Sequence, residues 1–290
     1  GDGFEALQRV LLGYIQHPNL AGVLLIGLGC EANQIKFLMD AFNLNENPFF
    51  QTMTIQEMGG LRKTIEEGIK RVEKMLPEVN KLQRSLQSVE HLSLALQCGG
   101  SDAWSGITSN PALGNAADLL VKNGGTVVLA ETPEIYGAEH LLTRRAISEK
   151  VGKKLVERIL WWEDYVEKNK GSLNNNPSPG NKAGGLTTIL EKSLGAAAKG
   201  GTTPLNDVLM YGEKAKSKGF LFMDSPGYDP ASVTGQIATG CNVVSFTTGR
   251  GSAFGSKPSP SIKIATNTEM YNHMIEDMDV NAGKIVTDNS

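Results

Sequence analysis

Short apolar runs along the chain alternate with longer segments in which apolar residues recur every three or four positions. The runs 22–28 and 92–97 are bounded by polar turn residues, as expected of strands buried on both faces. Helical spacing is clearest over 60–85, where one apolar face is made by Leu61, Ile65, Ile69, Val72 and Leu76. The pattern predicts further strands over 50–55, 126–130, 220–223, 243–246 and 262–265, and further helices over 31–42, 111–122, 140–168, 186–198, 204–217 and 232–238.

Strands that alternate with helices favour an α/β fold with a mainly parallel sheet flanked by helices, a Rossmann-like variant with right-handed crossovers. Segment 174–185, NNNPSPGNKAGG, has the composition of an exposed loop. We therefore predict a first α/β part over 1–173, a loop over 174–185 and a second α/β part over 186–290 that completes the same body.

Composition excludes some classes of partner. The 290 residues are 40% hydrophobic and 20% charged, with a formal net charge of −3, so neither nucleic acid nor an anionic membrane is an expected partner. No apolar stretch approaches the roughly 18 residues of a membrane span. Three cysteines, Cys30, Cys98 and Cys241, fit a reducing cytoplasm better than a disulfide framework.

Five loops that follow predicted strands carry the candidate chemistry. They are 27–33 (GLGCEAN), 98–106 (CGGSDAWSG), 131–140 (ETPEIYGAEH), 224–230 (DSPGYDP) and 247–255 (TTGRGSAFG). Glycine, proline, aspartate and serine also make plain turns, so each loop alone is weak evidence. A parallel sheet places all five at one edge, where α/β proteins bind ligands.

Loop 131–140 holds the densest group of metal-ligand side chains, with Glu131, Glu134, Glu139 and His140. Carboxylates and an imidazole suit Fe²⁺ or Mn²⁺. The alternative is that Glu139 and His140 only begin a solvated helix, where acids favour the N-terminus.

Cysteines at strand ends offer a second type of ligand. Cys30 and Cys98 each directly follow a predicted strand and are candidate iron ligands, although a buried cysteine often serves as a small apolar side chain. An iron–sulfur centre that adds Cys241 has no supporting CxxC spacing.

Substrate contacts are expected from two loops. Arg250 can form a forked contact with a carboxylate or a phosphate, with Thr247 and Thr248 beside it; a structural ion pair is the alternative. Ser101 is a candidate contact for a substrate hydroxyl.

Three residues are candidate acid–base groups. Lys192 can act as a base if burial lowers its pKa, and Asp102 is the alternative base. Glu191 is adjacent to Lys192 in a predicted helix, where such a pair commonly forms a solvated face. GLGCEA lacks the third glycine of a dinucleotide fingerprint.

At these loops the chain resembles the altronate dehydratase / galactarate dehydratase family. The resemblance rests on long segments, among them GLGCEANQI (27–35), LQCGGSDAWSGITSNPALG (96–114), ETPEIYGAEHLLTRRA (131–146), NKAGGLTTILEKSLGA (181–196) and FTTGRGSAFGSKPSPSIKIATNT (246–268). Segments DSPGYDPASVTGQ and LAETPEIYGAEHLLTRR are more similar to the altronate branch.

This resemblance implies a cytoplasmic, Fe²⁺-dependent or similarly metal-dependent sugar-acid dehydratase. It also implies that a small N-terminal β-rich domain and a C-terminal tail of the family are missing from this chain. We expect a homo-oligomer, with that N-terminal domain in a separate or missing segment. The family includes a sulfolactate sulfo-lyase subunit, which catalyses a different elimination.

The predicted reaction converts D-altronate to 2-keto-3-deoxygluconate. Lys192 or Asp102, with Glu191 nearby, removes the proton next to the carboxylate, and the neighbouring hydroxyl leaves. A metal held by a subset of Glu131, Glu134, His140, Cys98 and Cys30 stabilises the enediolate. The alternatives are a galactarate dehydratase, a sulfo-lyase subunit, a noncatalytic sugar-acid-binding subunit and a nucleotide-binding α/β protein.

Overall fold

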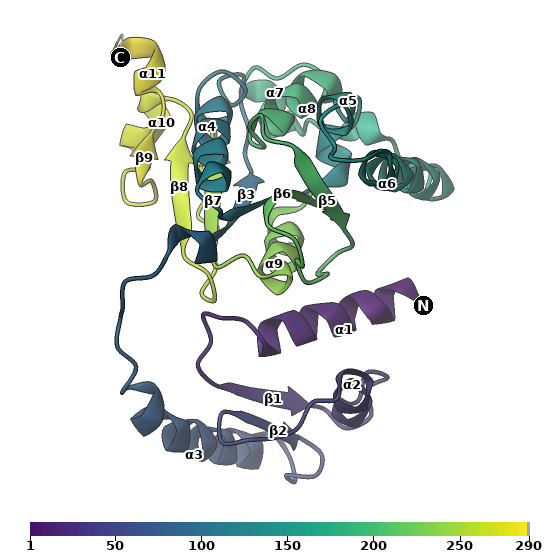
Figure 1. Ribbon diagram of the computed structural model, residues 1–290, viewed down its shortest axis with the longest axis vertical. Helices are drawn as coiled ribbons and strands as arrows, with labels where there is room; N and C mark the ends of the chain where they lie inside the picture. The colour runs from purple at the N-terminus through teal and green to yellow at the C-terminus, as the bar shows by residue number, and fades with distance from the viewer. Residues whose placement is uncertain (289–290) are drawn as a thin grey trace. The chain divides into compact units, whose positions relative to one another are not determined.

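The protein divides into two compact units, Gly1–Gln87 and Ser88–Ser290, in a computed structural model that describes residues 1–288 (Figure 1). The division differs from the boundary that we expected over 174–185, which lies inside the second unit. That segment is not a plain exposed loop, because it contains helix α7 (Pro179–Ala183) and the buried Asn181. Asn181 Nδ2 donates to the carbonyl oxygen of Ser101 at 2.9 Å, so the segment is fixed to a site loop.

The first unit is a small parallel α/β motif. Strand β1 (Val23–Gly27) pairs in parallel with β2 (Phe50–Thr54), as predicted. The helices are α1 (Asp2–Ile15), α2 (Ile35–Phe42) and α3 (Leu61–Val79). Helix α3 continues through Pro77 and ends at Val79, before the end of the segment 60–85 that the helical spacing predicted.

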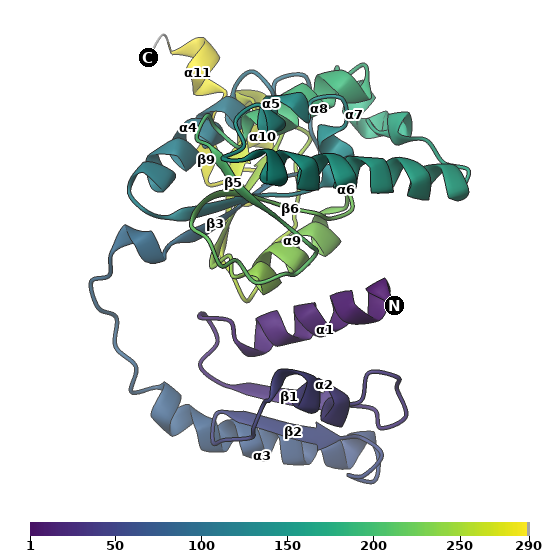
Figure 2. The same ribbon diagram turned by 45° about the vertical axis from the view of Figure 1, so that its right-hand side comes forward.

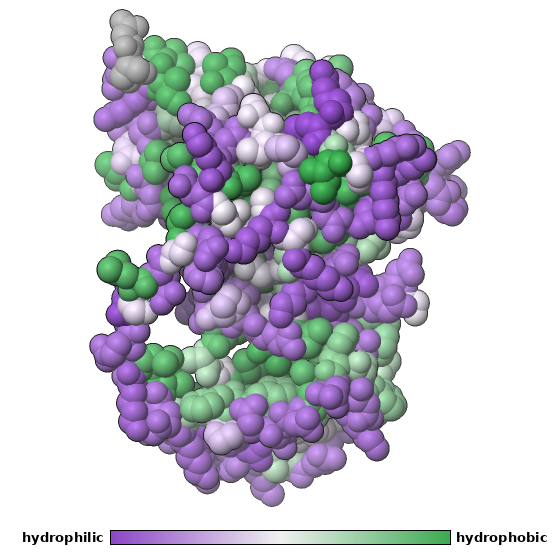
Figure 3. Space-filling view, in the orientation of Figure 1, coloured by the Kyte–Doolittle hydropathy of each residue, from purple (hydrophilic) through white to green (hydrophobic). Residues whose placement is uncertain are grey.

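Much apolar surface of the first unit is exposed. The buried residues of α3 are Thr64, Gly68 and Met75, whereas the apolar face identified in the sequence lies beside them and is exposed. In the space-filling view, a band of apolar residues also crosses this unit over β1 and α2 (Figure 3).

The second unit contains a seven-stranded parallel sheet in the order β5-β6-β4-β3-β7-β8-β9, which confirms the predicted fold class. Its strands are β3 (Ser93–Cys98), β4 (Thr126–Leu129), β5 (Leu205–Leu209), β6 (Gly219–Met223), β7 (Val243–Thr248), β8 (Ser261–Ala265) and β9 (Val280–Asn281). The central strands β4 and β6 are fully buried and β3 is buried after its first residue, as their continuous apolar runs indicated.

Helices cover both faces of this sheet. Helices α4 (Ser109–Lys122) and α6 (Glu149–Lys168) lie on one face and α9 (Asp229–Thr239) lies on the other in both ribbon views (Figures 1 and 2). The remaining elements are η1 (Val89–His91), η2 (Thr132–Ile135), α5 (His140–Thr143), η3 (Leu173–Asn175), α8 (Ile189–Ala198), α10 (Thr268–His273) and α11 (Lys284–Thr287). No helix within residues 1–288 is long and apolar enough to cross a membrane.

Two helix predictions in this unit were wrong. The predicted helix 204–217 begins instead with strand β5, which pairs with β6 and buries Leu205, Val208 and Leu209. The predicted helix 140–168 is broken into α5 and α6, and Ser148 Oγ caps α6 by accepting from Val151 N. In the first segment, pairing with β6 overrides the helical spacing. In the second, the cap at Ser148 begins a new helix.

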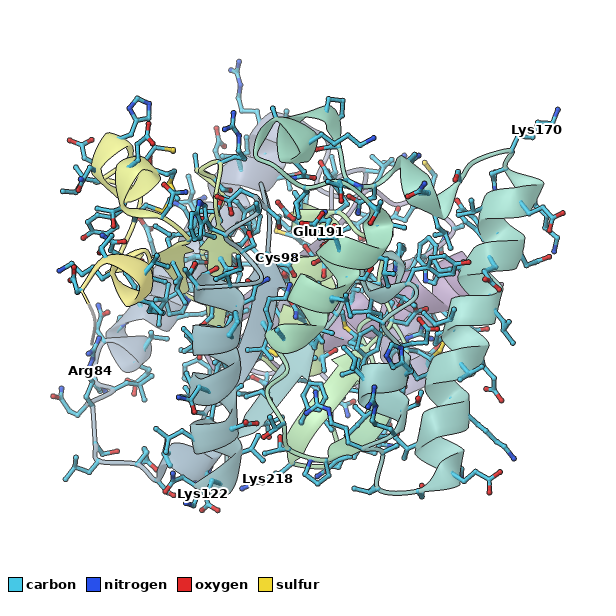
Figure 4. All side chains as sticks on the ribbon, turned by 90° about the horizontal axis from the view of Figure 1, so that it is seen from above. Arg84, Cys98, Lys122, Lys170, Glu191 and Lys218 are labelled. Carbon is cyan, nitrogen blue, oxygen red and sulfur yellow. The ribbon has the colours of Figure 1, made fainter. Side chains whose placement is uncertain are left out.

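The position of the site follows from the topology. Strands β3 and β7 are neighbours, and the chain leaves them toward opposite edges of the sheet, which creates a binding crevice at their carboxyl ends. Figure 4 shows Cys98 and Glu191 at this edge and Lys122 and Lys218 at the opposite edge.

Candidate active site

An open cleft of about 540 Å³ lies at the carboxyl ends of the strands. Its wall includes Gly99, Glu134, Lys192, Asp229 and Arg250. These residues come from the loops after β3, β4, β6 and β7 and from helix α8. The sheet therefore brings together most of the loops that the sequence singled out.

A buried group of one thiol and two carboxylates lies beside this cleft. Ligand atoms of Cys98, Glu131 and Glu134 all lie within 4.8 Å of one another. Cys98 Sγ donates to Glu134 Oε2 at 3.7 Å. Burial raises the pKa of the Cys98 thiol to about 12, although the nearby Lys199 lowers it.

Glu131 is the least compensated member of this group. Its carboxylate is buried, and neither oxygen has a hydrogen-bond partner. The backbone of Glu131 is left-handed, with φ 72°, a conformation that costs a non-glycine residue free energy. Burial, reinforced by the charge of Glu134, raises the pKa of Glu131 well above its usual value.

Glu134 is firmly paired. Lys192 Nζ donates to Glu134 Oε1 at 2.7 Å and to Asn176 Oδ1 at 2.8 Å, and Asn176 Nδ2 donates to the same glutamate oxygen at 3.0 Å. Burial alone would raise the pKa of Glu134, but Lys192 and Lys199 outweigh it and lower the pKa. Burial likewise opposes the charged form of Lys192, yet Glu134 and Cys98 raise its pKa.

Lys199 is a second buried ammonium group that the sequence analysis did not identify. It is only 1% exposed, and its Nζ donates to Cys98 Sγ at 2.6 Å. Burial opposes its charge, but Cys98 and Glu131 raise its pKa. The only signal in the sequence is a single lysine among small residues, AAAKGG.

Asp229 is a further group that we missed, although its loop was singled out. Burial raises the pKa of its carboxyl, and the charge of Glu134 raises it further. A Cβ atom at position 99 would overlap the Asp229 carboxylate, so Gly99 allows this side chain to lie against the β3 loop.

The buried group fits a divalent cation. A thiol and two carboxylates form a donor set that Fe²⁺ or Mn²⁺ accepts, and the unpartnered oxygens of Glu131 are available for coordination. Within residues 1–288, this is the single group of three or more acidic, thiol or imidazole side chains close enough to hold a metal.

Family models match both units. Residues 89–290 match the model described as D-galactarate/Altronate dehydratase, C-terminal, and residues 1–80 match D-galactarate dehydratase/Altronate hydrolase, second domain. The chain belongs to this dehydratase family. The resemblance inferred from the loops is thus confirmed.

Relatives of this chain carry names for different reactions. Altronate dehydratase of Bacillus subtilis is 40% identical over 99% of this chain and 57% of its own length. Galactarate dehydratase (L-threo-forming) of Escherichia coli is 40% identical over 93% of this chain and 53% of its own length. The (2R)-sulfolactate sulfo-lyase subunit beta of Chromohalobacter salexigens is 31% identical over 96% of this chain and 71% of its length. The chain therefore spans a little over half the length of the two sugar-acid dehydratases.

Asp102, expected as an alternative base, and two expected substrate contacts have structural partners in this member of the family. Asp102 accepts hydrogen bonds from Ser105 Oγ, Thr266 Oγ1 and Asn267 Nδ2, at 3.0 to 3.1 Å, so it ties loops together. Thr247 Oγ1 donates to Asn110 Oδ1 at 2.6 Å, and Thr248 Oγ1 accepts from Gly251 N at 3.1 Å.

Two other expected residues do face open space. Arg250 is exposed at the wall of the cleft, and its backbone N donates to Gly100 O at 2.8 Å. Ser101 is buried and lines a separate cavity of about 280 Å³ beside Cys98 and Lys192. Glu191, by contrast, accepts from Thr187 N at 2.8 Å and so stabilises the start of α8.

The remaining expected metal ligands lie outside the buried group. His140 is exposed at the start of α5. Cys30 belongs to the first unit, where its exposed thiol accepts from Gln56 Nε2 at 3.3 Å. Cys241 precedes β7, at the edge of the sheet opposite Cys98. The structure therefore does not bring Cys98 and Cys241 together for an iron–sulfur centre.

Proposed function

We propose that this chain forms the catalytic body of a dehydratase that removes water from a sugar acid, with D-altronate as the first candidate substrate. The buried Cys98, Glu131 and Glu134 group beside an open cleft carries the proposal. Membership of the dehydratase family supports it. Three free cysteines further support a cytoplasmic location.

Arg250 would bind the substrate carboxylate. Its guanidinium is exposed at the cleft and can form two parallel hydrogen bonds with a carboxylate. The loop is fixed by Gly249 N and Arg250 N, which both donate to Gly100 O at 3.1 and 2.8 Å. The anchored carboxylate would place the adjacent carbon near the acid–base groups of the cleft.

Asp229 and Lys192 are suited to the two proton transfers. The raised pKa of Asp229 makes its ionised form more basic than an ordinary aspartate, so it would take the proton next to the carboxylate. Lys192 stays an ammonium group because its pKa is raised rather than lowered, which favours a donor over the base that we expected. It would donate a proton to the hydroxyl that leaves as water, and the resulting enol becomes the 2-keto-3-deoxy acid.

Fe²⁺ or Mn²⁺ held by Cys98, Glu131 and Glu134 would supply positive charge for the enediolate. The positive charge of Lys199 would offset the negative charge of these side chains, because its ammonium group contacts Cys98 directly. The buried position of all three ligands would exclude water from that side of the substrate.

Galactarate is the alternative substrate, since one altronate dehydratase and one galactarate dehydratase are each 40% identical to this chain. An anaerobic assay with Fe²⁺ and thiol would offer D-altronate and galactarate separately and detect the 2-keto-3-deoxy product. Product from altronate supports the proposal. Product from galactarate alone would keep the dehydratase activity but replace altronate with galactarate as the substrate. A full-length protein that binds sugar acid but turns over neither would support a noncatalytic binding subunit.

Arg250→Ala should raise KM by about tenfold or more, because a charged hydrogen bond is lost. Its melting temperature should stay within about 2 °C of the parent, since the side chain is exposed. Lys122→Ala, at the opposite edge of the sheet, is the matched control. Unchanged kinetics in Arg250→Ala would remove this residue from the site.

A further inference from the structure

One end of the active-site cleft is lined by aromatic side chains of helix α6. Trp162 and Tyr165 both belong to the cleft wall, and Tyr165 is 46% exposed. The two rings meet edge to face with their centroids 5.5 Å apart, and Trp162 Nε1 donates to Asp224 Oδ1 at 2.8 Å. Trp162 and Tyr165 therefore form an apolar surface, the aromatic end, in a cleft whose other walls carry charged groups.

The aromatic end and Arg250 lie on opposite sides of the buried thiol and carboxylates. Asp224, which holds Trp162, directly follows β6, whereas Arg250 follows β7. Strands β4 and β3, which lead into the buried group, lie between them in the order β6-β4-β3-β7. Three interstrand spacings amount to about 14 Å. A six-carbon acid is roughly 6 Å long between its end carbons, so an acid held by the long Arg250 side chain extends across the buried group toward the aromatic end.

The aromatic end offers no countercharge for a second acidic group. The cationic residues of the cleft wall are Lys192 and Arg250. Lys192 is paired with Glu134 at 2.7 Å, and Arg250 is assigned to the first carboxylate of the substrate. Lys170, near the end of α6, extends outward (Figure 4). A second carboxylate at the aromatic end would therefore lose hydration without gaining an ionic partner.

We propose that the aromatic end receives the neutral, hydroxylated end of the substrate, so that the cleft selects acids with one carboxylate over acids with two. The C–H groups of such a chain pack against the ring faces, and its hydroxyls remain directed toward the open cleft. The face of an aromatic ring is the negative part of its quadrupole, which disfavours a carboxylate there. The inference rests on the proposed binding of a sugar acid by Arg250 and adds which class of acid fits.

Two acids of the same configuration that differ at C6 test this selection. D-Altronate ends in a CH₂OH group at C6, whereas D-altrarate ends in a carboxylate. Dissociation constants would be measured by calorimetry on the whole chain after treatment with a chelator, so that turnover does not obscure binding. Altronate should bind at least about tenfold more tightly, and D-galactonate should likewise bind more tightly than galactarate. Equal affinities, or tighter binding of the diacids, would overturn the proposal.

A cation placed at the aromatic end should reverse the preference. Tyr165→Arg should tighten binding of the diacids by about tenfold or more and weaken binding of altronate. Leu160→Arg is the matched control, because Leu160 lies on the same helix, is 56% exposed and does not line the cleft; it should leave both affinities unchanged. An unchanged ratio of affinities in Tyr165→Arg would overturn the assignment of this end.

Two further variants separate the ring from its hydroxyl. Tyr165→Phe keeps the ring and should retain the selectivity, whereas Tyr165→Ala should weaken binding of altronate by about fivefold. Circular dichroism would confirm that each variant is folded. Equal affinity for altronate in Tyr165→Ala and in the parent would show that the ring does not contact the substrate and would overturn the proposal.

The binding ratio and the product assay can fail independently. A preserved preference for the monoacids without any dehydrated product would reject the proposed reaction and retain this assignment. Product formation together with a preference for the diacids would retain the reaction and reject the assignment. Failure of all four acids to bind would reject both.

Discussion

At the residue scale, the site combines buried charges of both signs. Glu134 has two nitrogen partners, whereas Glu131 has none for either oxygen. An uncompensated buried carboxyl costs free energy unless it is neutralised or coordinated. Glu131 is therefore the residue whose environment is best explained by a bound cation.

Glu131→Gln should change the stability of the protein and its affinity for metal in opposite directions. Without metal, the amide removes the repulsion from Glu134, and the free energy of unfolding should rise by about 1 kcal/mol. Affinity for Fe²⁺ or Mn²⁺, measured by calorimetry, should fall at least about tenfold. Glu149→Gln, at an exposed ion pair on α6, is the control for loss of a carboxylate. Full metal affinity in Glu131→Gln would exclude this residue as a ligand.

Asp229 should set the acidic limb of the pH–rate profile. Its pKa is raised above the usual value of 3.8, and a base acts in the deprotonated form. Thus kcat/KM should increase with pH through this raised pKa, at a higher pH than an ordinary aspartate would give. Asp229→Asn should lower kcat at least about 100-fold, and the acidic limb should disappear from its pH–rate profile. An unchanged profile would assign the base to another residue.

At the element scale, sequence patterns predicted the sheet better than the site. Buried strands such as β3 and β4 have continuous apolar runs that require no knowledge of partners. Strand β5 could not be predicted this way, because its identity depends on pairing with β6. Glu131 and Glu134 could be identified from the sequence because they are nearby acidic residues that follow a predicted strand. Lys199 could not, because its role depends on contact with Cys98, which is distant in sequence.

Helix α8 places Lys192 through its N-terminal cap. Thr188 Oγ1 accepts from Glu191 N at 3.3 Å, and Lys192 lies in the next turn. Thr188→Ala should lower the free energy of unfolding by about 1 kcal/mol, measured by urea denaturation. Thr188→Ser keeps the accepting hydroxyl and should retain most of the stability. Equal losses in the two variants would show that the cap contributes little.

At the scale of the whole molecule, the two units are joined by a segment without regular structure. Residues 81–88 are exposed and follow α3. The proposed catalytic side chains all belong to the second unit.

Brief digestion with trypsin should therefore cut after Lys81 or Arg84 before it cuts elsewhere, since exposed chain without secondary structure is the preferred site of proteolysis. Mass spectrometry should detect one fragment from each unit. The larger fragment should retain a cooperative thermal transition, because its sheet and core are complete within residues 88–288. Early cleavage within α6 or α8 would contradict this division.

The hydrogen bonds from Gly249 and Arg250 to Gly100 also have a consequence for synthesis on the ribosome. The loop after β3 emerges early, but its partners emerge only when β7 has been translated. Domains generally fold as units, so the cleft can form only after β7 and the loop that follows it have been translated. A nascent or truncated chain that ends before residue 250 therefore lacks the arginine proposed to hold the acid, and substrate capture would require translation to pass this residue.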